Sequence, residues 1–180
     1  MTTLFKGKLI NPKANDYLRK IIEPVLCHLS DVPFSQSASQ LLLATAIKES
    51  QNFKYRQQIG GPALSYFQIE PNTHNDVWDN YLKFRPKLAK LVTQLLSAPD
   101  ADKIDELENN DNYAAAIARI VYKRSPAKLP PADDISAMAN YWKQHYNTPL
   151  GKGTPKGFID IWNKSTTNMN IIYKKKCVVL

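Results

Sequence analysis

The chain has 180 residues, which is enough for one domain with an apolar core and too few for two comfortable ones. Hydrophobic residues make up 43% and charged residues 22% of the sequence, a globular composition that excludes a disordered protein. The 24 basic and 16 acidic residues give a formal net charge of +8. This charge favours polyanionic partners but does not choose among nucleic acid, anionic membrane and anionic cell-wall polymer.

Several function classes are not expected from the sequence. The longest apolar stretch, residues 41–47, is too short to span a bilayer, so we expect no stable membrane insertion. The beginning of the chain, MTTLFKGKLINPK, has no apolar region before a cleavage site, so we expect no standard secretory signal. Cys27, Cys177 and the three histidines are scattered without metal-ligand spacing, so we expect no metal and no other cofactor.

Helical patterns dominate the first half of the chain. Apolar residues recur at helical spacing over residues 11–26, with a kink or break expected at Pro24. Either Ser35 or Ser37 is expected to cap the helix that follows. Residues 55–70 place a Gly-Gly-Pro sequence between short aromatic and β-branched runs, as in a small hairpin or an irregular loop.

The second half is also predicted to be helical. A T-x-x-D sequence at Thr73 predicts the start of a helix that continues beyond Pro86, and the acidic residues 100–111 are interpreted as a solvated helix and turn. Further helices are expected over residues 112–124, over 132–146 and from Pro155 onward. The sequence therefore predicts a mainly α protein with one small β element.

Glu49 is the most informative residue, because it lies at the end of the second predicted helix. At about 100° per residue, Glu49 falls almost directly above Leu42 in the apolar arc of that helix. Burial and the helix C-terminus would both raise the pKa of its carboxyl group, as a general acid requires near neutral pH. In the alternative interpretation, Glu49 bends out to solvent or pairs with Lys54 or Arg56.

The sequence after Glu49-Ser50 carries a resemblance to a known family. Residues 60–71, GGPALSYFQIEP, resemble the soluble lytic transglycosylase and goose-type lysozyme group. In that group a helix ends in Glu-Ser, and a hairpin with the pattern G-A-x-G-x-x-Q-x-x-P follows. Gln68 and Pro71 keep the spacing of this pattern, whereas Pro62 and Ser65 stand where the family usually has glycines.

The resemblance continues in order over residues 38–147. Asn112 and the alanines after it resemble the family's helix of Asn followed by small residues. Ala139-Asn140-Tyr141-Trp142 resembles its later A-Y-N segment, with Trp142 in place of the usual Asn. The amino-acid sequence of residues 63–86 and 140–154 is also similar to that of small lysozyme-like proteins of tailed bacteriophages.

This resemblance implies a fold and an activity. The fold would be an α+β lysozyme-like domain over residues 1–165, with a β-hairpin beside the active-site cleft, followed by a basic C-terminal tail over residues 166–180. The activity would be cleavage of the β-1,4 bond between N-acetylmuramic acid and N-acetylglucosamine in peptidoglycan. Glu49 would be the catalytic acid.

The sequence leaves two reaction modes open. A hydrolase commonly uses a second carboxylate, for which Glu70, Asp76 and Asp79 are the candidates. A lytic transglycosylase needs no second carboxylate, because the substrate's own 6-hydroxyl attacks and a 1,6-anhydro product forms. Since each candidate also has a purely structural interpretation, the sequence leans slightly to the transglycosylase mode.

The expected glycan contacts combine apolar faces with hydrogen-bonding groups. Within the resemblance, Ser50, Tyr66, Gln68 and Tyr141 are the candidates for substrate binding, and Tyr141 is expected to hydrogen-bond Glu49.

The expected partners are peptidoglycan glycan strands and, in a phage particle, other virion proteins, and we expect a monomer in solution. One hypothesis is an endolysin that is made in the host cytoplasm and reaches the periplasmic cell wall through a holin. Another is a virion enzyme that opens the wall during genome entry. A third is a non-catalytic peptidoglycan-binding or structural module on the same fold. A nucleic-acid binder would rest on charge alone, so none is expected.

The last four residues form a separate motif. Residues 177–180, CVVL, match the prenylation pattern C-a-a-X and follow three lysines. A bacterial host has no prenylating enzyme, so we interpret this match as coincidence and the segment as a packed or flexible basic terminus.

Overall fold

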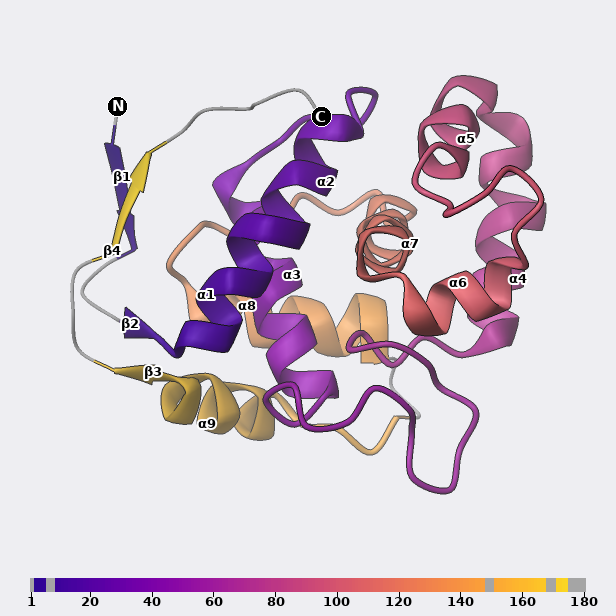
Figure 1. The fold of residues 1–180 in the computed structure, drawn as a ribbon. Coiled ribbons are helices and arrows are strands. Elements are labelled where there is room, and N and C mark those ends of the chain that lie inside the picture. Colours follow the sequence, from indigo (N-terminus) through magenta and orange to yellow (C-terminus); the bar gives the residue numbers. More distant parts are fainter. Residues whose placement is uncertain (1, 6–8, 148–150, 168–170, 175–180) are drawn as a thin grey trace.

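The structure is a computed structural model that describes residues 2–5, 9–147, 151–167 and 171–174, most of which are helical (Figure 1). The predicted mainly α class is therefore confirmed. Within these ranges, no helix is both long enough and apolar enough to cross a membrane.

The first helical segment is continuous but irregular. It consists of α1 (Pro12–Tyr17), the π-helical turn η1 (Leu18–Ile22) and α2 (Glu23–His28). Asn11 caps its start by accepting a hydrogen bond from a backbone N–H of the first turn. Pro24 lacks an N–H, and the widened turn immediately before α2 accommodates the missing donor. The irregularity expected at Pro24 is thus present, one turn earlier.

The other helices follow in chain order. They are α3 (Gln36–Glu49), α4 (Pro71–Asn80), α5 (Pro86–Thr93), α6 (Lys103–Asn109), α7 (Asp111–Lys123), α8 (Ile135–Trp142) and α9 (Pro155–Ser165), with a 3-10 turn η2 (Leu82–Phe84) and a π-helical turn η3 (Lys143–Asn147). Ser35, one of the two expected caps, accepts from the Ala38 N–H at the start of α3 (3.1 Å). The expected start of α4 at Thr73 was wrong, because Pro71 occupies the first helical position, where its missing N–H is harmless.

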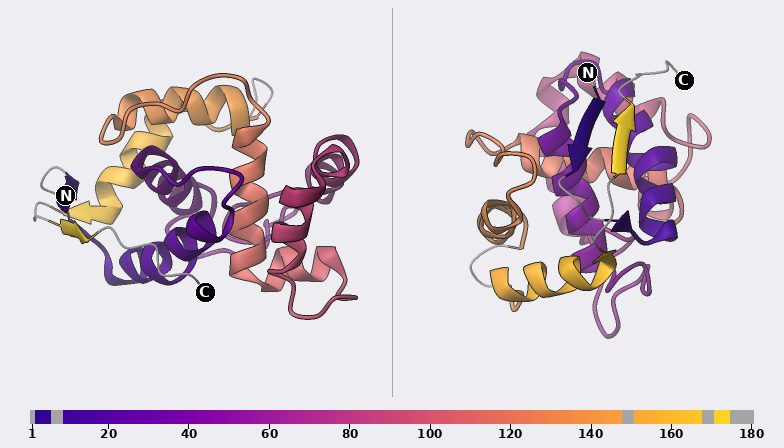
Figure 2. Two further views of the ribbon diagram at one scale, coloured as in Figure 1. Left: turned by 90° about the horizontal axis from the view of Figure 1, so that it is seen from above. Right: turned by 90° about the vertical axis from the view of Figure 1, so that its left-hand side faces the viewer.

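Helices α3 and α7 form the centre of the molecule. Residues 38–47 of α3 and residues 113–122 of α7 are buried on every side. The one-sided apolar arc predicted for α3 was therefore wrong, since a helix that is surrounded need not be amphipathic. Seen from above, α7 stands between the purple helices α1–α3 and the pink helices α4–α6 (Figure 2).

Residues 55–70, the bridged loop, connect α3 to α4 without a regular hairpin. Single antiparallel bridges join Gln57 to Leu64 and Leu64 to Ile69. Ser65 and Gln68 have φ angles of 64° and 48°, in the left-handed region that interrupts strand pairing. The small β-hairpin expected beside the cleft is therefore present only as these two bridges.

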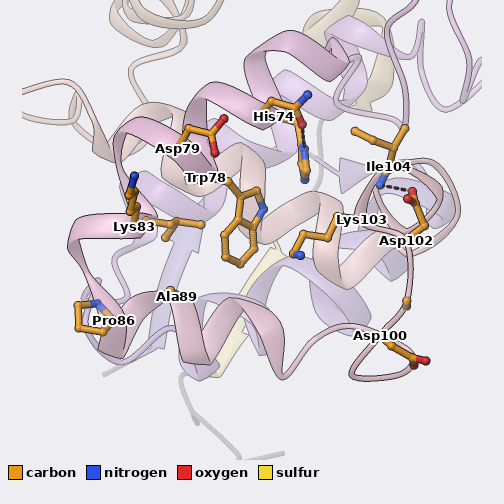
Figure 3. A pocket seen from close by; sticks show the side chains of 13 residues that line it. His74, Trp78, Asp79, Lys83, Pro86, Ala89, Asp100, Asp102, Lys103 and Ile104 are labelled. Carbon is orange, nitrogen blue, oxygen red and sulfur yellow. Dashed lines mark hydrogen bonds between the residues drawn. The ribbon is translucent and has the colours of Figure 1, made fainter.

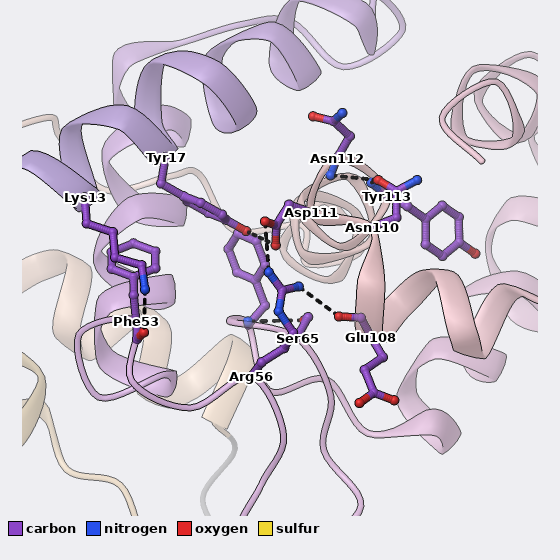
Figure 4. Close-up of polar contacts among 11 residues, drawn as sticks. Lys13, Tyr17, Phe53, Arg56, Ser65, Glu108, Asn110, Asp111, Asn112 and Tyr113 are labelled. Atoms are coloured by element: carbon purple, nitrogen blue, oxygen red, sulfur yellow. Dashed lines mark hydrogen bonds and ion pairs between the residues drawn. The ribbon is translucent and has the colours of Figure 1, made fainter. Parts of the chain in front are cut away.

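Arg56 ties the bridged loop to the start of α7 (Figure 4). Its guanidinium donates to the Glu108 carbonyl oxygen (2.8 Å) and to Asp111 Oδ2 (3.0 Å), and it lies 4.3 Å from the centre of the Tyr66 ring. Tyr17 donates to the other oxygen of Asp111 (3.3 Å). Arg56 is thus paired with Asp111, and the alternative pairing with Glu49 is not formed.

The end of the described chain returns to its beginning. Strand β1 (Thr2–Phe5) pairs antiparallel with β4 (Ile171–Lys174), and β2 (Leu9–Ile10) pairs with β3 (Thr166–Thr167). The segment expected as a basic tail over residues 166–180 thus contains two paired strands. The CVVL motif lies outside the described residues.

Candidate active site

Glu49, the last residue of α3, is half-buried and its carboxyl group is held by Trp142. The indole Nε1–H of Trp142 donates to Glu49 Oε1 at 2.7 Å. Burial raises the pKa of Glu49 to about 7, although the Trp142 hydrogen bond and the positive charge of Lys48 act in the opposite direction. The predicted upward shift of this pKa is therefore confirmed, and near neutral pH the group can both donate and accept a proton.

Glu49 opens into a groove of about 760 Å³. The groove lies between the end of α3, the bridged loop, one residue of α7 and the end of α8 with η3. Its polar and aromatic lining consists of Lys48, Glu49, Gln51, Tyr55, Gln58, Gln68, Glu70, Thr73, Trp142, Tyr146, Asn147 and Lys152. Amide groups and aromatic rings in one concave site suit a sugar, which presents hydroxyl groups and apolar faces together.

The backbone immediately after Glu49 is strained. Gln51, Asn52 and Phe53 have φ angles of 51°, 64° and 61°, although none of them is glycine. For residues such as Gln51 and Phe53 this left-handed region costs about 1–2 kcal/mol, whereas asparagine adopts it more readily. Strain of this kind persists where the surroundings fix the backbone, which is frequent at functional sites.

Ser50 fixes this left-handed turn and does not line the groove. Its hydroxyl is fully buried, donates to the Ala46 carbonyl oxygen (2.6 Å) and accepts from the Phe53 N–H (2.6 Å). The prediction of Ser50 as a substrate contact was therefore wrong, since both hydrogen bonds of the hydroxyl are with the backbone.

Replacing Ser50 by alanine is expected to lower the free energy of unfolding by about 1–3 kcal/mol, because the Phe53 N–H would lose its partner inside the protein. Denaturation in urea measures this change, and the exposed Ser30→Ala variant serves as the control, with a change below about 0.5 kcal/mol. Unchanged stability together with a raised KM for glycan would contradict the structural role.

Gln68 and Glu70 both lie in the groove with Glu49. The Gln68 side-chain amide donates to the Ser65 carbonyl oxygen (2.8 Å) and to the Arg56 carbonyl oxygen (3.2 Å), so it is rigidly held. Ser65 stands where the resembling family has glycine, and its positive φ is the conformation that favours glycine.

Tyr66 and Tyr141 lie outside the groove, so both predictions of a substrate contact were wrong. Tyr66 packs at the other side of the bridged loop, 5.2 Å from the Phe53 ring. The Tyr141 hydroxyl donates to the Ala127 carbonyl oxygen (3.1 Å) and not to Glu49. Successive residues of a helix point about 100° apart, so the neighbour Trp142 takes the place expected for Tyr141.

Two of the three candidate second carboxylates also lie elsewhere. Asp76 accepts from Asn80 and forms an ion pair with Arg124, and these hydrogen bonds lower the pKa of Asp76. Asp79 lines a second, larger concavity of about 910 Å³ between α4, α5 and α6 (Figure 3). Among the three candidates, only Glu70 shares the groove with Glu49.

The second concavity contains a fixed polar network. The Tyr113 hydroxyl accepts from Trp78 Nε1 (2.8 Å) and shares a second hydrogen bond with His74 Nε2 (2.8 Å). The other ring nitrogen of His74, Nδ1, lies 3.1 Å from Asn75 Oδ1, and burial lowers the pKa of this histidine. The network holds α4 against α7, a structural role for the half-buried Trp78.

Sequence reasoning missed Tyr146 and Asn147, which line the groove. The Tyr146 hydroxyl donates to the Phe67 carbonyl oxygen (2.8 Å) and so ties η3 to the bridged loop. These residues also form a Tyr-Asn pair, whereas the resemblance to the A-Y-N segment lies at residues 139–142. The π-helical turn η3 turns both side chains toward the groove, as such turns often do at functional sites.

Within the described part of the chain, no group of three or more His, Cys, Asp or Glu residues is arranged to hold a metal ion. Comparison of the chain with protein-family models, with curated proteins and with solved structures found no match. The function is therefore inferred from the residues and the geometry of the groove.

Proposed function

We propose that the protein cleaves the β-1,4 bond between N-acetylmuramic acid and N-acetylglucosamine in peptidoglycan, with Glu49 as the general acid. The observation that carries this proposal is a carboxyl group with a pKa of about 7, fixed by Trp142 in a groove of amides and aromatic rings. A carboxylic acid that stays protonated near neutral pH is what protonation of a glycosidic oxygen requires.

The geometry supports different roles for the two oxygens of the Glu49 carboxyl group. Oε1 of Glu49 accepts the Trp142 N–H, so Oε2 is the oxygen that carries the proton. Glu49 would give this proton to the leaving glycosidic oxygen as the bond to the anomeric carbon breaks and an oxocarbenium-like centre develops. The resulting carboxylate can then take a proton from the group that attacks the anomeric carbon.

Two attacking groups are compatible with this site. In a lytic transglycosylase the muramic acid 6-hydroxyl attacks, Glu49 takes its proton, and a 1,6-anhydro ring forms without water. In a lysozyme, water attacks with the help of a second carboxylate, for which Glu70 is the candidate in the groove. We favour the transglycosylase mode, because it needs Glu49 alone.

Mass spectrometry of the soluble products from purified peptidoglycan tests the proposal and its two modes. Products that end in 1,6-anhydromuramic acid would support the transglycosylase, and reducing ends heavier by one water would support the lysozyme. No release from the walls of several bacteria would contradict cleavage and favour the non-catalytic module.

The resemblance to lysozyme-like phage proteins extends the proposal to a biological setting. The enzyme would act on the bacterial wall of a phage host, either in lysis after passage through a holin or as a virion component during genome entry. The net charge of +8 would hold it on anionic wall polymer in both settings.

The cleavage rate is expected to follow the protonation of Glu49. Its pKa of about 7 keeps the acid almost fully protonated at pH 5, whereas each pH unit above about 7 would lower the rate about tenfold. A pH profile of kcat on isolated peptidoglycan measures this fall of the rate at alkaline pH. A rate that stays constant from pH 6 to pH 9 would contradict the role of Glu49 as the acid.

A further inference from the structure

Phe84, at the end of η2, is an exposed aromatic side chain with no role in the groove. Among the large hydrophobic side chains of the described residues, Ile59 and Phe84 are the most exposed, with 75% and 69% of their surface accessible. Ile59 lines the groove, where a ligand can cover it. Phe84 lies in neither concavity described above, so its exposed ring indicates a different partner.

Several basic residues are close to Phe84 in the sequence, on η2 and on α5. Lys83, Arg85, Lys87 and Lys90 are all exposed, and residues 80–99 contain no Asp or Glu. Lys87 and Lys90 are three residues apart on α5 and therefore share one face of the helix. We call residues 83–90 the basic corner.

The positive charge of the basic corner is not balanced by ion pairs. None of its four basic side chains takes part in the ion pairs found within the described residues. Figure 3 shows Asp100 and Asp102 across the concavity from Lys83, and only Asp79 on the same side. The Arg85 guanidinium stacks 3.7 Å from the centre of the Tyr81 ring and donates to the Tyr81 carbonyl oxygen (3.0 Å).

We infer that the basic corner is a peripheral docking site for anionic lipid membranes. Lysine and arginine side chains would contact lipid phosphates, while Phe84 would enter the boundary between headgroups and acyl chains. An anionic wall polymer would attract the same cations but would offer Phe84 no apolar environment, which is why the exposed ring favours a membrane. Helix α5 lies at the opposite end of the molecule from the bridged loop, so docking would leave the groove open (Figure 1).

Co-sedimentation of the full chain with lipid vesicles tests this inference. Vesicles of phosphatidylglycerol and phosphatidylcholine are expected to bind the protein, with binding lost at high salt, whereas pure phosphatidylcholine vesicles bind it weakly. Phe84→Ala is expected to lower the partition coefficient about tenfold. The double variant Lys87→Gln/Lys90→Gln is expected to lower it about 25-fold, because each lysine contributes about fivefold.

Matched controls distinguish binding through the basic corner from effects of net charge and of exposed apolar surface elsewhere on the protein. Ile59→Ala removes an equally exposed apolar side chain, and Lys54→Gln/Lys164→Gln removes the same charge from exposed sites elsewhere, so both should bind as the unaltered protein does. Equal binding to both kinds of vesicle would overturn the inference. Charge-dependent binding that Phe84→Ala leaves unchanged would overturn it too, in favour of an anionic polymer.

This inference is independent of the proposed cleavage. Variants of the basic corner should degrade isolated peptidoglycan at the normal rate, because that assay contains no membrane. Conversely, a protein that failed to cleave peptidoglycan could still bind vesicles, so the two proposals fail separately.

Discussion

Replacing Glu49 by glutamine is expected to lower peptidoglycan cleavage by about 10²–10⁴-fold, the usual contribution of a general acid. Glutamine has nearly the same shape and can still accept the Trp142 N–H, but it has no proton to give to the leaving oxygen. Release of labelled glycan from isolated walls measures the loss. Binding of the variant to the same walls should remain close to normal.

The control for Glu49→Gln is Glu70→Gln, which changes the other carboxylate in the groove in the same way. A change of less than a few fold would accompany a transglycosylase, whereas a loss like that of Glu49→Gln would accompany a lysozyme that uses Glu70. Full activity of Glu49→Gln would contradict the proposed mechanism altogether.

Glu49→Gln is also expected to change the free energy of unfolding, and this measurement shows whether the variant is folded. The folded-state pKa of Glu49 is raised from 4.5 to about 7, so its favourable contribution is complete below pH 4.5 and is lost as the pH rises through 7. Glutamine does not titrate. At pH 8 the free energy of unfolding of Glu49→Gln should therefore exceed that of the unaltered protein by about 2 kcal/mol. This figure is reduced because the half-buried carboxyl group keeps some contact with solvent. The difference should shrink toward pH 4.

The sequence alone predicted the helical class and the position of Glu49. Helices could be predicted because caps and breakers are local signals: Ser35 accepts a hydrogen bond from the first turn of α3, and Pro155 occupies the first turn of α9. The half-burial of Glu49 could be predicted only as one of two alternatives, because it rests on helix phase and residues 38–47 of α3 are buried on every side. Both predictions depend on residues close together in the chain.

The contacts of the groove could not be predicted to the same degree. Trp142 meets Glu49 across 93 residues, and a one-residue error in helix phase exchanges it for Tyr141. The left-handed turn over residues 51–53 contains no glycine from which it could be predicted. Its conformation depends on the buried Ser50 hydroxyl, whose hydrogen bonds with the backbone of Ala46 and Phe53 are local but follow no recognised sequence pattern.

The loop after α3 could be predicted only in part. Gln68 lies in the groove with Glu49, whereas the expected hairpin is reduced to two bridges. Pro62 lacks an N–H and Ser65 has a positive φ, and both features interrupt a strand ladder. The groove therefore has an irregular backbone on this side, and Trp142 and Tyr146 support it through hydrogen bonds to Glu49 and to the Phe67 carbonyl oxygen.

Replacing Trp142 by alanine is expected to lower the free energy of unfolding by about 3–5 kcal/mol. The indole is fully buried, with its ring centre 5.1 Å from that of Phe158 on α9 and the Lys48 ammonium 5.6 Å above it. Its removal would leave a cavity between α8 and α9 beside the groove. Chemical denaturation measures this loss, although such a variant would not separate packing from the chemistry of Glu49.

Trp142→Phe makes that separation, because phenylalanine keeps an aromatic ring in the core but has no N–H to donate. The Trp142 hydrogen bond lowers the pKa of Glu49, so its loss should raise this pKa and move the alkaline limb of the pH profile upward. The control is Trp162→Phe on α9, which removes similar apolar contact from a ring that is also buried. If Trp142→Phe lowered stability but had the same pH profile of cleavage as Trp162→Phe, Trp142 would be a packing residue only. An upward shift confined to Trp142→Phe would establish that the indole N–H sets the acidity of Glu49.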